Sequence, residues 1–173
     1  SIGQVHKARL RESGETVAVK LLRENIQTQV RIDILLLNLF LKIFRPLFTD
    51  QTRHSIEAVL RAFTRVIRQE VSMLQELANL EHFSQVYAGS GIRFPRPYKA
   101  HCSDYALVMS FEAGIRIDDV AGVDQLNVSF DELMQQLVLF YTEQMLVKGF
   151  FHADPHPGNL LVSPDGELIL LDF

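Results

Sequence analysis

Residues 152–159, with the sequence HADPHPGN, constrain the fold of this chain more than any other segment. Two prolines and a glycine within eight residues exclude a regular helix or strand, so the segment forms a loop with a fixed backbone. Two apolar stretches follow, residues 160–162 and 168–171, and a Pro-Asp-Gly turn separates them. This pattern predicts a β-hairpin. Asp172 follows Asn159 by 13 positions, so the hairpin should return it to the same cleft as the loop.

The polar residues of this region have the spacing of a phosphotransfer site. His152, Asp154 and Asn159 match the H-x-D-x-x-x-x-N pattern of a kinase catalytic loop, in which the aspartate accepts or orients the proton of the attacking hydroxyl and the asparagine binds magnesium. Asp172-Phe173 matches the start of the D-F-G element, whose aspartate holds the magnesium between the β- and γ-phosphates. The other interpretations are a structural turn or a zinc site at the two histidines, but no cysteine lies nearby and no third ligand is obvious.

A lysine suited to phosphate binding lies on the second of two N-terminal strands. Residues 3–10 and 16–22 flank a turn, which predicts a hairpin. Val17-Ala18-Val19-Lys20 matches the V-A-I-K pattern, whose lysine pairs with the α- and β-phosphates and with a helix glutamate. Alternation along the strand places Lys20 on the face that meets the cleft. Spacing alone does not choose the glutamate among four candidates: Glu57, Glu70, Glu76 and Glu81.

Two helical regions separate Lys20 from the later strands. Residues 32–48 are rich in Leu, Ile and Phe, and Pro46 ends the run. Asp33 interrupts the run, and four other polar residues in or next to it form one stripe at helical spacing: Arg31, Asn38, Lys42 and Arg45. The charges exclude a membrane span, so this amphipathic helix either packs on protein or lies on a membrane surface. A second helical region is predicted over residues 55–83.

The remaining elements complete an α+β pattern. Residues 105–111 predict a strand, and Ser129 with Glu132 forms a capping box that opens a helix ending at Gly149. The order of elements predicts a protein-kinase-like fold with two lobes and a cleft between them. Residues 1–111 would form the N-lobe with the inserted helices, and residues 112–173 the hinge and the start of the helical C-lobe.

Composition excludes several classes of protein. The net charge of −4 gives no electrostatic case for nucleic-acid binding. The single cysteine, Cys102, excludes an internal disulfide framework. No secretory signal opens the chain, and both of its ends look cut.

No G-x-G-x-x-G precedes Lys20, and the chain instead begins Ser1-Ile2-Gly3-Gln4. With the motifs above, this segment resembles the UbiB family of atypical kinases, also called the ABC1-like or aarF-domain family, in which an alanine-rich loop replaces the glycine-rich loop. The resemblance covers nearly the whole chain. It also includes the segment Glu76-Leu77-Ala78-Asn79 and the stretches 151–162 and 170–173.

The resemblance implies a role for each site residue. Lys20 is the nucleotide lysine and Glu76 its helix partner, Asp154 takes the catalytic position, and Asn159 and Asp172 are the metal ligands. Residues 1–4 (Ser1, Ile2, Gly3 and Gln4) would contact the nucleotide. Glu70 would begin the family's E-x-D element, in which Ser72 here replaces the second carboxylate.

The resemblance also implies ATP and Mg²⁺ as cofactors and an ATPase or phosphotransferase activity linked to ubiquinone biosynthesis. Membrane lipid, quinone precursors and quinone-biosynthesis proteins are the implied partners, besides ATP and ADP and without nucleic acid. The implied location is the cytoplasmic side of the bacterial inner membrane, or a mitochondrion or plastid. Two alternatives stay open: a small-molecule kinase of the aminoglycoside or choline type, which shares the catalytic loop, and a nucleotide-binding pseudokinase that acts as a scaffold.

Overall fold

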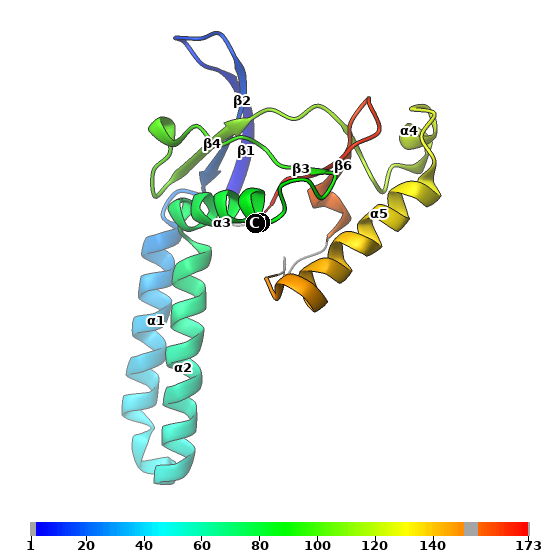
Figure 1. The fold of residues 1–173 in the computed structure, drawn as a ribbon. Coiled ribbons are helices and arrows are strands. Elements are labelled where there is room, and N and C mark those ends of the chain that lie inside the picture. Colours follow the sequence, from blue (N-terminus) through cyan, green and yellow to red (C-terminus); the bar gives the residue numbers. More distant parts are fainter. Residues whose placement is uncertain (1–2, 151–155, 173) are drawn as a thin grey trace.

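The computed structural model describes residues 3–150 and 156–172, without the side chains of residues 45 and 68–70. The expectations for Ser1, Ile2 and Asp154 therefore lie outside the described residues. Two small sheets and several helices form a mixed α+β fold, as predicted (Figure 1).

The first sheet carries the predicted lysine. It consists of β1 (Gly3–Arg9), β2 (Thr16–Leu22) and β4 (Ala106–Ser110), all antiparallel, in the order β1-β2-β4. The predicted N-terminal hairpin and the predicted strand near residue 106 are both confirmed. Lys20 lies in the central strand, opposite Val5 of β1 and Leu107 of β4. A central strand is held on both sides, so it gives Lys20 a rigid support.

The second sheet carries the predicted metal ligands near its strand ends. β3 (Ile92–Arg93), β7 (Leu168–Leu170), β6 (Leu160–Val162) and β5 (Ile115–Arg116) lie in that spatial order. β6 and β7 form the predicted C-terminal hairpin, whereas β3 and β5 were not predicted. β3 precedes residue 111 in the chain but belongs to this second sheet, and the division of the chain at residue 111 stays a prediction.

A helical hairpin projects from the rest of the molecule (Figure 1). It consists of α1 (Ile26–Ile43), the short 3₁₀ turn η1 (Arg45–Leu47) and α2 (Asp50–Glu70). α1 begins six residues before the predicted helix and ends before Pro46. None of the residues of α1 is buried.

The exposed side of this hairpin is apolar. Seven side chains at helical spacing are 50–75% exposed, and we call them the apolar ridge: Ile32, Leu35, Leu36, Leu39, Phe40, Ile43 and Leu47. A stripe of this size is unusual on a soluble surface and is typical of a face that meets a partner. In the described part of the chain, no helix has the length and apolar character needed to cross a membrane.

The second predicted helical region is two helices. α2 ends at Glu70, and α3 (Met73–Val86) begins after a break at residues 71–72. Ser72 adopts an extended backbone and its Oγ accepts the N–H of Gln75 at 3.3 Å, which makes it the N-cap of α3. The prediction of one helix over residues 55–83 was therefore wrong, because the apolar spacing alone does not reveal an internal cap.

Substituting Ser72 should test this cap. Ser72→Ala is expected to lower the free energy of unfolding by about 1 kcal/mol. Ser72→Asp should leave that free energy unchanged, because aspartate is as favourable at the N-cap as serine. Urea denaturation followed by circular dichroism measures both variants. Ser55→Ala is the matched control, since Ser55 lies inside α2 and its hydroxyl donates to the carbonyl of Gln51. An equal loss in this control would contradict the capping role.

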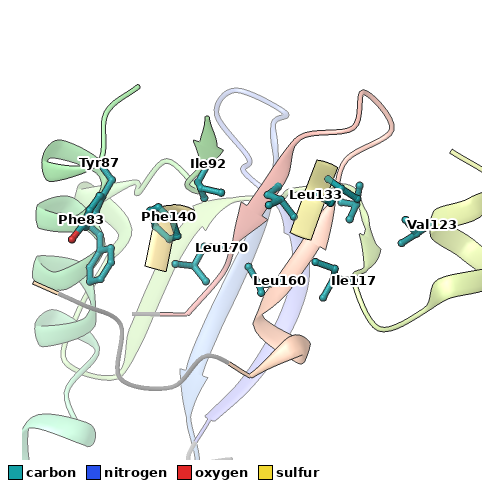
Figure 2. Close-up of a cluster of buried hydrophobic side chains, with 11 residues drawn as sticks. Phe83, Tyr87, Ile92, Ile117, Val123, Leu133, Phe140, Leu160 and Leu170 are labelled. Atoms are coloured by element: carbon teal, nitrogen blue, oxygen red, sulfur yellow. The ribbon is translucent and has the colours of Figure 1, made fainter. Parts of the chain in front are cut away.

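The larger hydrophobic core joins α3 to the second sheet (Figure 2). α5 (Phe130–Glu143) and α4 (Val120–Asp124) contribute Phe140, Leu133 and Val123 to it. Ser129 caps α5 as predicted, and a π-helical turn, η3 (Gln144–Lys148), extends it to Gly149. At Gly149 φ is +65°, a value that favours glycine and ends the helix where predicted. Two 3₁₀ turns complete the fold, η2 (Lys99–His101) and η4 (Pro157–Asn159).

A smaller core fixes α3 against the first sheet. Met73 and Leu80 of α3 are buried with Ala18 of β2 and with Leu107 and Met109 of β4. Burial of such side chains contributes about 1.5–3 kcal/mol each. The first turn of α3 is thereby held beside the strand that carries the predicted lysine.

Candidate active site

Three charged side chains from distant parts of the chain meet between the two sheets. The Nζ of Lys20 contacts Oε1 of Glu76, and it donates to Oδ1 of Asp172 at 2.5 Å. Lys20 and Glu76 are 16% and 11% exposed, whereas the Asp172 side chain is 40% exposed. The ammonium group thus lies between two carboxylates, of which only that of Asp172 opens substantially to solvent.

Three different elements supply these groups. Lys20 is in β2, Glu76 is in the first turn of α3, and Asp172 follows β7. Ala18 lies two residues before Lys20 and packs in the same small core as Met73 and Leu80 of α3. This packing places the first turn of α3 over the strand, which is why Glu76 reaches Lys20.

The C-terminal hairpin places Asn159 and Asp172 side by side in the backbone. Leu160 pairs with Leu170 across β6 and β7, and the N–H of Leu171 donates to the carbonyl of Asn159 at 2.9 Å. Asp172 therefore directly follows Leu171, the residue whose N–H is bonded to Asn159. The two residues predicted as metal ligands thus leave the hairpin at the same end.

The other residues predicted for the site are only partly described. Gly3 packs on β2, where an added Cβ would lie 2.9 Å from the carbonyl oxygen of Leu21 and 3.8 Å from Cγ of Lys20. The Oε1 of Gln4 lies 3.4 Å from the His6 ring on an exposed face. The close approach of the Gly3 backbone leaves no room for a side chain beside the stem of Lys20.

The other glutamate candidates have different surroundings. Glu57 contacts Arg53 and Arg61 along α2, and Glu81 contacts Lys99 at 2.6 Å. The side chain of Glu70 lies outside the described residues. The structure therefore pairs Lys20 with Glu76, a choice that spacing along the sequence could not make.

Burial, together with an imbalance of charge in the cluster, shifts the pKa of Glu76. Burial raises the pKa of Glu76 to about 7; the contact with Lys20 opposes this rise, and the nearby Asp172 carboxylate adds to it. Burial lowers the pKa of Lys20, but the two carboxylates outweigh it and the net shift is upward. One ammonium cannot neutralise two carboxylates, so the more buried carboxylate binds a proton more readily.

This shift predicts how stability depends on pH in the metal-free protein. The folded pKa of Glu76, about 7, is above its ordinary value of 4.5, so the stabilisation is complete below pH 4.5 and is lost as the pH rises through 7. The free energy of unfolding should fall by about 3 kcal/mol across this window, at 1.36 kcal/mol per pKa unit. Urea denaturation of wild type and Glu76→Gln at several pH values measures it. The fall in the free energy of unfolding with pH should be absent in the variant. If the variant shows the same fall, another titrating group causes it.

Sequence reasoning missed a second polar group beside the loop. Arg116 of β5 makes two hydrogen bonds to Asp118, of 2.9 and 2.6 Å, and these bonds lower the pKa of the Asp118 carboxyl. The His156 Nδ1 accepts the N–H of Gly158 at 3.0 Å. The signal available in the sequence was a histidine two residues before a glycine, because its ring nitrogen can accept the N–H of that glycine.

Comparison with known proteins identifies the family of this chain. All of residues 1–173 match the ABC1 atypical kinase-like domain. The kinase named Protein ACTIVITY OF BC1 COMPLEX KINASE 3, chloroplastic, of Arabidopsis thaliana is 33% identical over 100% of this chain and 24% of its own length. The probable protein kinase UbiB of Erwinia tasmaniensis is 34% identical over 94% of this chain and 30% of its own length. The chain thus spans about a quarter to a third of these relatives.

A solved structure supports the same assignment. The Rv3197–erythromycin complex from Mycobacterium tuberculosis superposes on this chain with a TM-score of 0.73 and 25% identity, over 100% of this chain and 43% of that one. The predicted resemblance is confirmed, and the chain belongs to the family of ABC1 atypical kinase-like domains.

Proposed function

We propose that this chain binds ATP with Mg²⁺ and acts on the terminal phosphate, as an ATPase or a phosphotransferase of the UbiB type. The observation that carries the proposal is the position of Lys20 between Glu76 and Asp172. An ammonium held by two carboxylates stays charged and fixed in direction, which suits it to bind the α- and β-phosphates. Its raised pKa favours the charged form.

The donor set near Asp172 fits magnesium. Mg²⁺ prefers oxygen ligands and is usually bound by one or two carboxylates together with substrate phosphates. The partly exposed Asp172 carboxylate and the amide of Asn159 supply such oxygens from one end of the C-terminal hairpin. When bound, Mg²⁺ would neutralise the charge that develops on the phosphate oxygens.

The chain's own residues have separate tasks in this proposal. Lys20 orients the nucleotide phosphates, Glu76 fixes the direction of Lys20, and Asp172 with Asn159 holds the metal. Gly3 lets the backbone of β1 lie close to the carbonyl of Leu21 beside Lys20, where a larger residue would not fit. Asp154, outside the described residues, would accept or orient the proton of the attacking hydroxyl or water.

The apolar ridge supports the part of the proposal that places the chain at a membrane surface. Its apolar side chains are exposed, and Arg31 and Lys42 lie on the same helix. Exposed Leu, Ile and Phe with neighbouring cations favour the surface of an anionic membrane. A lipid or a quinone precursor at that surface is the acceptor that we propose.

Phosphate release by the full-length protein tests the activity. The assay compares Mg²⁺ with EDTA, with and without liposomes that contain anionic lipid. We expect hydrolysis only with Mg²⁺ and a higher rate with liposomes. Faster turnover with choline or an aminoglycoside than with liposomes would favour the small-molecule kinase. If nucleotide binds without Mg²⁺-dependent turnover in any condition, the chain is a nucleotide-binding scaffold instead.

A further inference from the structure

His156 makes two hydrogen bonds that hold the turn leading to Asn159. Its ring Nδ1 accepts the N–H of Gly158 at 3.0 Å, and its carbonyl accepts the N–H of Asn159 at 2.9 Å. Pro157, between them, has no N–H to donate. His156 thus accepts both N–H groups of the turn η4, one with its side chain and one with its backbone.

The ring of His156 and the backbone of Gly158 fit closely together. An added Cβ at Gly158 would lie 2.9 Å from Nδ1 and 3.2 Å from Cε1 of the imidazole. A real side chain would push the ring away from the N–H that it accepts. The ring at residue 156 therefore favours glycine at residue 158, although φ at this glycine is not positive.

This turn is connected directly to both predicted metal ligands. Asn159 donates its N–H to His156 and accepts the N–H of Leu171 with its carbonyl, at 2.9 Å each. Both backbone polar groups of Asn159 are bonded, one to the loop and one to the strand before Asp172. The direction of the Asn159 side chain relative to Asp172 therefore depends on the position of η4.

We propose that His156 is a positioning residue for the metal ligand Asn159, an inference that rests on the proposed function. A ring nitrogen accepts a hydrogen bond only when it carries no proton, so this bond requires the tautomer with its proton on Nε2. The Nη2 of Arg116, which pairs with Asp118, lies 3.9 Å from the position of the same added Cβ. The imidazole acts through the backbone of the turn and need not touch the nucleotide.

Two substitutions separate this role from simple packing. In His156→Asn the amide Oδ1 occupies the place of Nδ1 and can accept the same N–H, as asparagine does in an Asx-turn. In His156→Leu the acceptor is lost while an apolar side chain of similar size remains. Gly158→Ala is a third variant, which keeps the histidine but displaces its ring.

Binding of Mn²⁺ to the full-length protein, followed by electron paramagnetic resonance with a non-hydrolysable ATP analogue, is the direct readout. One hydrogen bond corresponds to about a two- to tenfold change in affinity, so His156→Leu and Gly158→Ala should each raise the Kd for Mn²⁺ by about that factor. His156→Asn should bind within about twofold of wild type. The double variant that combines His156→Leu with Gly158→Ala should bind Mn²⁺ no more weakly than either single variant, because both substitutions remove the same hydrogen bond.

The outcomes separate this inference from the proposed function. If wild type shows no Mn²⁺ binding with the analogue, the proposed function fails and the inference with it. If wild type binds Mn²⁺ and His156→Leu binds equally well, only the positioning role is wrong. Equal weakening in His156→Asn and His156→Leu would also overturn it, because the retained acceptor would then have no effect. Thermal melting without metal should change little in His156→Leu, since residue 156 is exposed.

Discussion

Replacing Asp172 by asparagine should lower Mg²⁺-dependent nucleotide turnover on the order of a thousandfold. A metal ion stabilises the transition state by several kcal/mol, and each 1.36 kcal/mol corresponds to about tenfold in rate. The amide of asparagine has nearly the same shape as the carboxylate but lacks its charge. The substitution therefore weakens the metal site while β7 and its pairing with β6 remain intact. Phosphate release at saturating ATP, titrated with Mg²⁺, measures the loss.

The same substitution has a second readout, which does not depend on activity. The Asp172 carboxylate helps to raise the pKa of Glu76, so its removal should lower that pKa and reduce the pH dependence of stability. Asp165→Asn is the matched control, because Asp165 is exposed in the turn between β6 and β7. Turnover by Asp165→Asn should equal that of wild type. If Asp172→Asn also turns over ATP at the wild-type rate, Asp172 is not part of the mechanism.

Local patterns predicted those parts of the fold that local chemistry decides. Both hairpins, the cap at Ser129 and the helix end at Gly149 follow from residue types within a few positions of each other. Turn residues, capping side chains and β-branched strands act over that same range. The positions of Lys20 and Asp172 at strand sites were predictable for this reason.

The parts that were missed depend on contacts between distant residues. β3 has only two residues, and its pairing with β7 is parallel, so no local turn indicates it. The break before α3 was hidden because apolar spacing continues across Ser72 on both sides. Spacing left four glutamates open as partners of Lys20, and only the family resemblance named Glu76. The packing of Met73 and Leu80 with the strands of the first sheet brings Glu76 to Lys20, and no spacing reveals that packing.

The exposure of α1 is another feature that the sequence pattern predicted only in part. The amphipathic pattern predicted a helix and its apolar stripe, and the structure contains both. The pattern did not say which face meets α2, because α1 is apolar over a wide arc. In the structure, the apolar ridge is exposed while other side chains of α1 line the space against α2, among them Asn38 and Leu41.

The second large effect is expected from Phe140→Ala, which should lower the free energy of unfolding by about 3–5 kcal/mol. Phe140 is 2% exposed. The centroid of its ring lies 5.2 Å from that of Tyr87, in an edge-on arrangement, and 6.3 Å from that of Phe94. Tyr87 caps the C-terminal end of α3, so this cluster joins the helix of Glu76 to the core of the second sheet. The variant should therefore weaken the fold and the alignment of Glu76 with Asp172 together.

Urea denaturation monitored by circular dichroism measures this loss, with Leu139→Ala as the matched control on the same helix. Leu139 is 69% exposed, so its truncation should change the free energy of unfolding by less than about 0.5 kcal/mol. Because small domains are stable by about 5–15 kcal/mol in total, Phe140→Ala would remove a large share of that stability. If Phe140→Ala cost no more than Leu139→Ala, the core around Phe140 would not hold α3 and the second sheet together. The contact of Lys20 with Asp172 would then need another support.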